Sequence, residues 1–161
     1  MKSIELFNDN FQNWKRHINC KAQLIIADPP YNIGSDAYAS NPTWYINSDN
    51  RNGESEKAGR EFFDTDKNFK PAEFMHFCSQ MLVKEPKEAG KAPCMVLFCE
   101  FEQQYQYIEL ARRYGLKKYI NLVFRKDYSA QVLKANMKIV GNCEYGLVLY
   151  RGSRSSETVG A

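Results

Sequence analysis

Residues 23–31 read QLIIADPPY and join a continuous apolar run to a double proline. The run is rich in β-branched residues and has no polar alternation, which is typical of a strand covered on both faces in a parallel sheet. Pro29 biases Asp28 toward an extended conformation, and Asp28-Pro29-Pro30 is expected to bound the strand. The segment therefore predicts a buried strand with an acidic residue and two prolines at its carboxyl end.

Candidate strands and helices alternate on either side of this strand. Upstream, Ile4–Phe7 is expected to be a short strand, and Asn10–Ile18 has the apolar spacing of a helix. Downstream, the expected elements are a helix from Pro71, a strand over Pro93–Cys99, a helix over Phe101–Tyr114, and strands over Tyr119–Phe124 and Tyr145–Tyr150. This order predicts an α/β domain over residues 1–150, with a doubly wound, mostly parallel sheet and a hairpin at one edge. Residues 151–161 are expected to be a flexible tail.

The composition is that of one globular domain. The chain has 161 residues, of which 43% are hydrophobic and 25% are charged. Its longest apolar run, Cys94–Cys99, is far shorter than the roughly 18 residues of a membrane span. Together with the lack of a signal-peptide core, this predicts a cytoplasmic protein without membrane contact. Five cysteines without C-x-x-C spacing predict free thiols, and the distant His17 and His76 predict no metal site.

Basic residues are concentrated in one part of the chain. The segment 112–138 contains a single acid, Asp127, among eight basic residues. The basic residues are Arg112, Arg113, Lys117, Lys118, Arg125, Lys126, Lys134 and Lys138. Such a stripe predicts contact with nucleic-acid phosphates, and a solvated basic face is the alternative. The long segment 31–70, which carries isolated aromatic residues, is expected to be either a functional loop or a surface excursion.

The residues after the buried strand have the chemistry of an amine-binding site. Asp28 offers a carboxylate, while Pro29 and Pro30 offer carbonyl oxygens without N–H groups, so this loop only accepts hydrogen bonds. Tyr31 adds an aromatic face on which a planar base can stack. In a duplex, an amino group is reached only after the base is extruded. The alternative is a strand end stiffened by prolines and without chemistry.

The segment LIIADPPYNIG at residues 24–34 resembles the catalytic region of amino-group DNA methyltransferases. The resemblance is to the phage and prophage enzymes, related to restriction-modification, that methylate adenine N6. It implies a catalytic role for Asp28, Pro29, Pro30 and Tyr31, a DNA contact for Asn32, and S-adenosylmethionine contacts for Asp9 and Asp28. Weaker likenesses follow in the order typical of the family, at Phe124-Arg125-Lys126 and at Asn142-Cys143-Glu144-Tyr145.

The resemblance also implies a cofactor loop that this sequence does not contain. The family binds S-adenosylmethionine through Phe-x-Gly-x-Gly, and none of the nine glycines here forms a G-x-G. The family's strand order is 3-2-1-4-5-7-6, of which this chain is expected to supply strands 3 to 7. An incomplete domain is therefore expected, the target-base half, either a fragment or one piece of a split enzyme. Its expected partners are DNA and a complementary chain or second copy that supplies the missing half.

Two other functions stay open at this stage. The chain could be a non-catalytic nucleic-acid-binding or interaction remnant that kept the fold without cofactor binding. It could also retain the chemistry with RNA or a protein amide as substrate.

Overall fold

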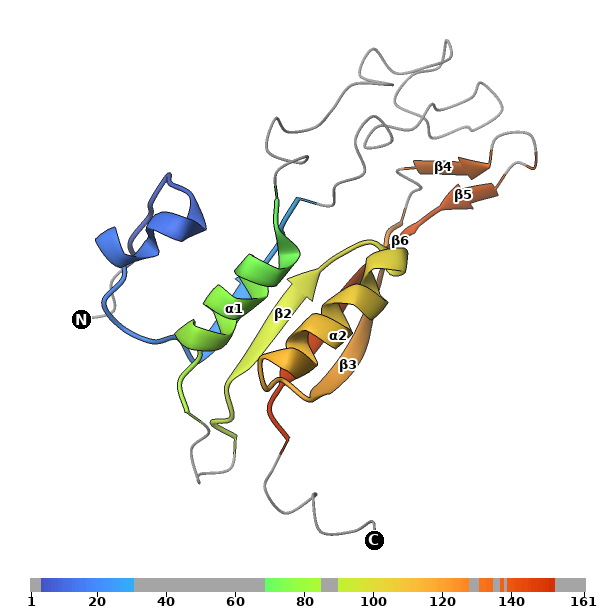
Figure 1. The fold of residues 1–161 in the computed structure, drawn as a ribbon. Helices are drawn as coiled ribbons and strands as arrows, with labels where there is room; N and C mark the ends of the chain where they lie inside the picture. The colour runs from blue at the N-terminus through green and yellow to red at the C-terminus, as the bar shows by residue number, and fades with distance from the viewer. Residues whose placement is uncertain are drawn as a thin grey trace, which may run out of the picture.

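The computed structural model describes residues 4–30, 69–84, 90–127, 131–134, 137 and 139–152. Two α-helices, two 3₁₀ helices (η) and six strands lie within these ranges (Figure 1). In chain order they are η1 (Phe11–Arg16), β1 (Leu24–Ala27), α1 (Pro71–Met81), β2 (Cys94–Phe98), η4 (Phe101–Gln103), α2 (Gln104–Arg113), β3 (Lys118–Arg125), β4 (Gln131–Lys134), β5 (Ile139–Gly141) and β6 (Cys143–Tyr150).

Four strands form the main sheet in the order β1-β2-β6-β3. β1 pairs with β2 in parallel, and β6 runs antiparallel to both β2 and β3. Three of the four strands therefore point the same way, and β6 is reversed between two of them. The α/β class is confirmed, and so is the strand order 4-5-7-6 that the methyltransferase resemblance implies for this part of the sheet.

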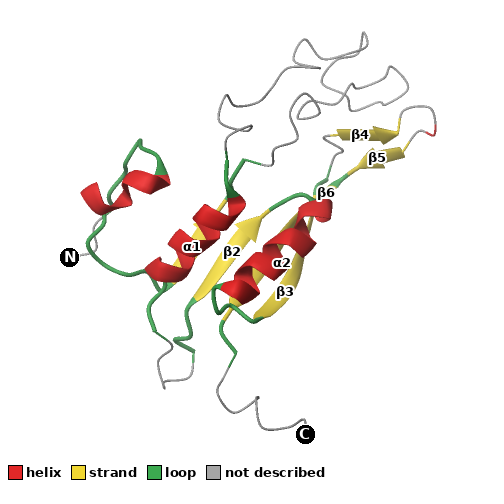
Figure 2. Ribbon diagram, viewed as in Figure 1, coloured by secondary structure: helices red, strands yellow, loops and turns green. Residues whose placement is uncertain are grey.

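Both α-helices pack on the same side of this sheet (Figures 1 and 2). Alternate strand residues face them, so Met95, Leu97 and Leu147 have no exposed surface. From the helices, Met75 and Ala111 are also fully buried in the same cluster. Each such Leu or Met side chain contributes roughly 1.5–3 kcal/mol by leaving water. This single core holds the described part of the fold together.

The helix boundaries follow signals in the sequence. Pro71 occupies the first turn of α1, where its missing N–H is not needed, as predicted. Glu100 and Gln103 form a capping box before α2. Gly115 follows the C-cap Tyr114 and adopts a φ of +87°, a conformation that side chains with a Cβ rarely take.

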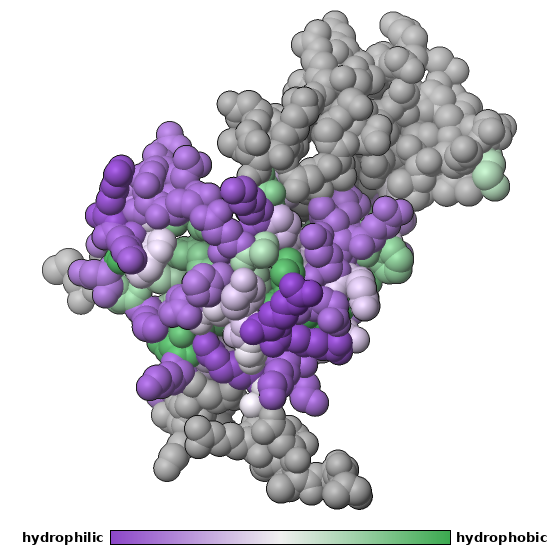
Figure 3. All heavy atoms as spheres, viewed as in Figure 1, coloured by the Kyte–Doolittle hydropathy of each residue, from purple (hydrophilic) through white to green (hydrophobic). Residues whose placement is uncertain are grey.

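The opposite face of the sheet is apolar and is not covered by any helix in the described part of the chain. Ile26 is 66% exposed, Ile120 52% and Leu24 51%. A doubly wound sheet would cover this face too, so the described residues contain only one of the two helical layers. By contrast, the helix-bearing side in Figure 3 is mostly hydrophilic, with hydrophobic residues in a narrower central area.

Two expected elements differ in the structure. Ile4–Phe7 is not a strand, so that prediction was wrong: Ile4 and Leu6 are 90% exposed, and no described strand pairs with them. A short apolar run needs a neighbouring strand to become one. The helix expected over Asn10–Ile18 is the shorter 3₁₀ helix η1. The β4–β5 hairpin within the basic segment was not predicted.

The chain leaves the sheet at Arg151, which is tied to α1. Its Nη1 donates to the carbonyl oxygen of Val83 at 2.8 Å, and its Nη2 donates to that of Ser79 at 3.2 Å. The expected tail therefore begins with an anchored residue, and residues 153–161 lie outside the described ranges. None of the described helices is long and apolar enough to cross a membrane.

Candidate active site

Asp28, Pro29 and Pro30 follow β1 directly, at the carboxyl end of the parallel pair β1–β2. Asp28 is exposed, Pro29 is buried and Pro30 is half-buried. The buried proline fixes the backbone under the acid, while the carboxylate remains accessible. Ligands of open α/β sheets bind outside the carboxyl ends of the strands, so the placement predicted for these three residues is the one found.

The remaining members of this predicted cluster cannot be placed. Tyr31 and Asn32 lie outside the described residues. Whether the phenol of Tyr31 faces the same space as Asp28 stays a prediction.

A pocket of about 720 Å³ opens beside these residues. Asp28, Pro29 and Pro30 form one part of its wall, and the turn before η1 forms another through Asp9 and Asn10. Sites for small molecules commonly enclose about 300–1,000 Å³. The structure thus brings together Asp9 and Asp28, the two acids that the sequence assigned to cofactor contact.

Aromatic rings form the apolar wall of the same pocket. The ring centroid of Phe11 lies 5.2 Å from that of Phe74 and 5.4 Å from that of Phe77. Phe69 joins them at 5.5 Å from Phe74. These are distances at which aromatic rings attract each other. A ligand in the pocket would therefore meet both carboxylates and aromatic rings.

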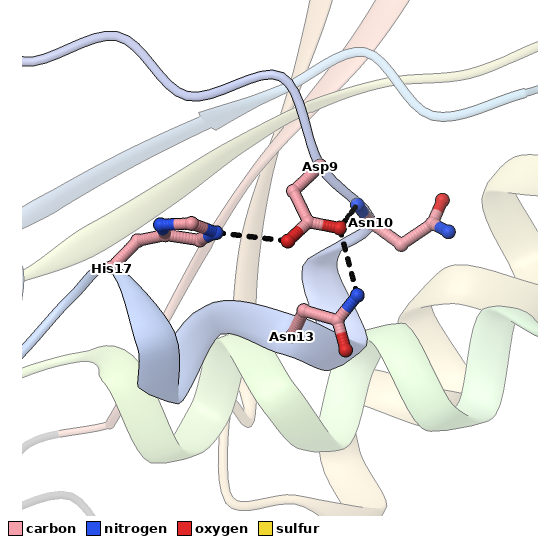
Figure 4. A network of polar contacts seen from close by, with 4 residues as sticks. All are labelled: Asp9, Asn10, Asn13 and His17. Carbon is pink, nitrogen blue, oxygen red and sulfur yellow. Dashed lines mark hydrogen bonds and ion pairs between the residues drawn. The ribbon is translucent and has the colours of Figure 1, made fainter.

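Asp9 is held by three hydrogen bonds (Figure 4). Its Oδ1 accepts from the backbone N–H of Asn10 at 2.8 Å and from Nδ2 of Asn13 at 2.7 Å. Its Oδ2 lies 2.8 Å from Nε2 of His17. The bonds from Asn13, His17 and Asn10, in that order of importance, lower the pKa of Asp9 to about 2. Asp9 is therefore an anion at neutral pH.

A second group of charges lies at the carboxyl ends of β2 and β3. Glu100 follows β2, and burial raises the pKa of its carboxyl, with a smaller contribution from Glu102 and Glu144. Lys126 forms an ion pair with Glu144. Glu100 was not predicted as a site residue, and its capping role before α2 accounts for its position.

The predicted basic stripe is divided between two edges of the sheet. Arg112, Arg113, Lys117 and Lys118 lie where α2 ends and β3 begins. Arg125 and Lys126 lie at the other end of β3, the same edge as Asp28. Seven residue steps at ~3.3 Å put roughly 23 Å between Lys118 and Arg125. The structure therefore does not bring all of these residues together.

Several of these basic residues are engaged with other groups. Arg112 pairs with Glu109 at 2.7 Å, and Lys126 pairs with Glu144. Lys134 belongs to β4, of which only the backbone is described, and Lys138 lies outside the described residues. Arg125 and Lys126 are thus the predicted DNA contacts that the structure places on the side of Asp28.

Two features of the site were missed by sequence reasoning. Phe74 and Phe77 belong to the apolar residues of α1, and both line the pocket. His17 was considered only as a metal ligand, and within the described ranges no group of three or more His, Cys, Asp or Glu side chains could hold a metal. The spacing of Asp9, Asn13 and His17, four residues apart, places side chains on one side of an α-helix but not of the 3₁₀ helix that forms here, so the sequence alone does not predict this contact.

Comparison with solved structures finds similar crystal structures, among them two of M1.HpyAVI. One is the M1.HpyAVI–SAM complex, 16% identical with a TM-score of 0.49; the match covers 88% of this chain and 49% of that chain. The other is M1.HpyAVI, which is 15% identical with a TM-score of 0.48; this match covers 89% of this chain and 53% of that chain. This chain thus spans about half the length of these two structures. No family model and no curated protein matches the sequence. Similarity at this level does not establish a function.

Proposed function

We propose that this chain carries the target-base site of an S-adenosylmethionine-dependent DNA methyltransferase that acts on adenine N6. The observation that supports this most directly is the position of Asp28, Pro29 and Pro30 beside the 720 Å³ pocket, at the carboxyl end of β1. The site offers hydrogen-bond acceptors on a rigid backbone, next to a group of aromatic side chains.

The acceptors suit an exocyclic amino group. The amino nitrogen of adenine is a weak nucleophile because its lone pair is delocalised into the ring. Hydrogen bonds from its two N–H groups to the Asp28 carboxylate and the Pro29 carbonyl favour a tetrahedral nitrogen and localise the lone pair. Held by Asp28 and Pro29 in this way, the nitrogen would accept the methyl group that bound S-adenosylmethionine supplies, and one N–H proton would leave to solvent.

The base must leave the duplex to reach these groups. Extrusion costs a few kcal/mol of stacking and pairing. We expect Tyr31 to offset part of that cost by stacking on the base, at about 1–3 kcal/mol for a base–aromatic contact. Arg125 and Lys126, on the same edge of the sheet, are the residues we expect near the DNA phosphates.

The residues present fit part of S-adenosylmethionine. This cofactor supplies an electrophilic methyl group when it is bound. Asp9 offers an ionised acceptor for hydroxyl or amino donors of an adenosyl group, and Phe11 offers an aromatic face. No G-x-G is present in the sequence to hold the amino-acid end. We therefore propose that a companion polypeptide carrying the glycine-rich loop completes the site and covers the exposed face of the sheet.

The test is methyl transfer by the completed enzyme. This chain is joined to a polypeptide that carries a glycine-rich cofactor loop, and is incubated with S-adenosylmethionine and DNA that lacks N6-methyladenine. Mass spectrometry of the nucleosides is expected to detect N6-methyladenine. Asp28→Asn should lower its formation by about 100-fold or more, because one acceptor becomes a donor aimed at the amino group. Asp127→Asn, a matched change at an exposed acid outside the pocket, should leave the rate unchanged.

A second candidate function is a nucleic-acid-binding remnant without catalysis. The missing G-x-G favours it. It predicts that the joined protein binds DNA in a salt-sensitive way but forms no N6-methyladenine. That result would overturn the methyltransferase proposal.

A further inference from the structure

The orientation of the Asp9 carboxylate depends on a side chain eight residues away. An ionised carboxylate offers about four acceptor positions. Two on Oδ1 are filled by the N–H of Asn10 and by Asn13. One on Oδ2 is filled by His17. Within the described residues, the remaining acceptor position is therefore also on Oδ2, the oxygen whose direction His17 sets.

His17 is itself fixed from two sides. Its backbone N–H donates to the carbonyl oxygen of Trp14 at 2.9 Å, as the C-cap of η1. Its ring stacks on Phe7, with centroids 4.6 Å apart and planes inclined by 27°. The imidazole thus has little freedom to turn away from Asp9.

The hydrogen bond between Asp9 and His17 has a defined donor and acceptor. Because Asp9 is ionised at neutral pH, its oxygen can only accept, so Nε2 of His17 must carry the hydrogen. A donor held at 2.8 Å from Oδ2 leaves that oxygen one direction in which to accept another hydrogen bond. Asp9 is one of the residues that line the pocket, together with Asp28 and Phe11, so a ligand bound there lies next to the Asp9 side chain.

We propose that His17 is a positioning residue, which holds Asp9 Oδ2 so that it accepts a hydrogen bond from the adenosyl group of the cofactor. This inference rests on the proposed function, because that function identifies the ligand. His17 does not touch the ligand itself; it acts through Asp9.

Two substitutions separate this role from simple packing. His17→Gln keeps an N–H donor and loses the aromatic stacking on Phe7. His17→Phe keeps the stacking and loses the donor. If the hydrogen bond matters, the glutamine variant is the milder one, and if packing matters, the phenylalanine variant is the milder one.

The probe is S-adenosylhomocysteine, and its dissociation constant for the joined protein that carries the glycine-rich loop is measured by titration calorimetry. We expect His17→Phe to weaken binding about tenfold, the typical effect of losing a hydrogen bond to a charged group. His17→Gln should stay within about threefold of the wild type. A carbon-13 NMR titration of the Asp9 carboxyl serves as a ligand-free readout, in which the pKa should rise in His17→Phe and stay low in His17→Gln.

The opposite results would overturn the inference. Equal affinities for all three proteins, or a weaker effect of phenylalanine than of glutamine, would leave His17 with a packing role only. Lack of any binding by the joined protein with the wild-type sequence would also overturn it. Failure of the proposed function is seen separately, as the absence of N6-methyladenine from the joined enzyme.

Discussion

The two faces of the main sheet are built from the same strands but have different surroundings. On the helix side, Met95, Leu97 and Leu147 are fully buried. On the other side, Ile26 and Ile120 are more than half exposed, although they lie in the middle of their strands. Successive side chains of a strand point to opposite faces, so one strand contributes to both environments.

The two faces therefore have different roles: one stabilises the fold, and the other is available for association with another surface. The helix side provides the packing that holds the described fold together. The open side is as apolar as a core, and its rings already contact each other, since Phe98 and Phe124 lie 5.3 Å apart. Exposed apolar surface of this kind marks an interaction site or a tendency to aggregate. The open face should therefore tolerate changes that the helix side does not.

The largest expected loss of stability comes from a cavity created under the helices. Leu97→Ala removes a fully buried side chain and should lower the free energy of unfolding by about 2–5 kcal/mol. Ile26→Ala, on the open face of the neighbouring strand, should cost about 1 kcal/mol or less, mainly through strand propensity. Urea unfolding of both variants measures the difference. Equal losses would mean that the open face is packed in the folded chain.

The next effect concerns the tie between β6 and α1. Arg151→Ala removes two hydrogen bonds from a charged group to the carbonyl oxygens of Val83 and Ser79, and should cost about 1.5–3 kcal/mol. Arg112→Ala is the matched control, because Arg112 forms a surface pair with Glu109 that contributes about 0.5 kcal/mol or less. Thermal unfolding distinguishes the two. If both variants unfold at the same temperature, Arg151 does not hold the end of the sheet on the helix.

Much of this fold could be predicted because its signals are local. Continuous apolar runs predicted β1, β2 and β6, Pro71 predicted the start of α1, and the double proline predicted the end of β1. Ile4–Phe7 failed for the same reason, because a local apolar run does not supply the partner that a strand requires.

The site was predictable only in its chemistry. Asp28, Pro29 and Pro30 were predicted from their residue types and their place after a strand; the structure confirms that place, and their catalytic role stays a prediction. The division of the basic residues was hidden, because a strand of eight residues separates positions that are close in sequence. The bond between Asp9 and His17 was also missed, because it depends on how tightly η1 turns.

The smallest effect on stability, and the sharpest test of the two faces, comes from charges on the open side. Ile26 and Ile120 lie in one row across the sheet, with Val96 and Val148 between them. The double variant Ile26→Lys and Ile120→Lys should change the free energy of unfolding by about 1 kcal/mol or less, since both side chains already reach water. It should, however, abolish association, because a docked apolar surface would bury two unpaired charges.

Sedimentation velocity over a concentration series is expected to show self-association of the isolated wild-type chain and a monomer for the double variant. Tyr119→Lys, at an exposed position on the opposite face of β3, should behave like the wild type. A wild-type chain that stays monomeric up to its solubility limit, and that binds no companion polypeptide, would show that the open face is ordinary surface.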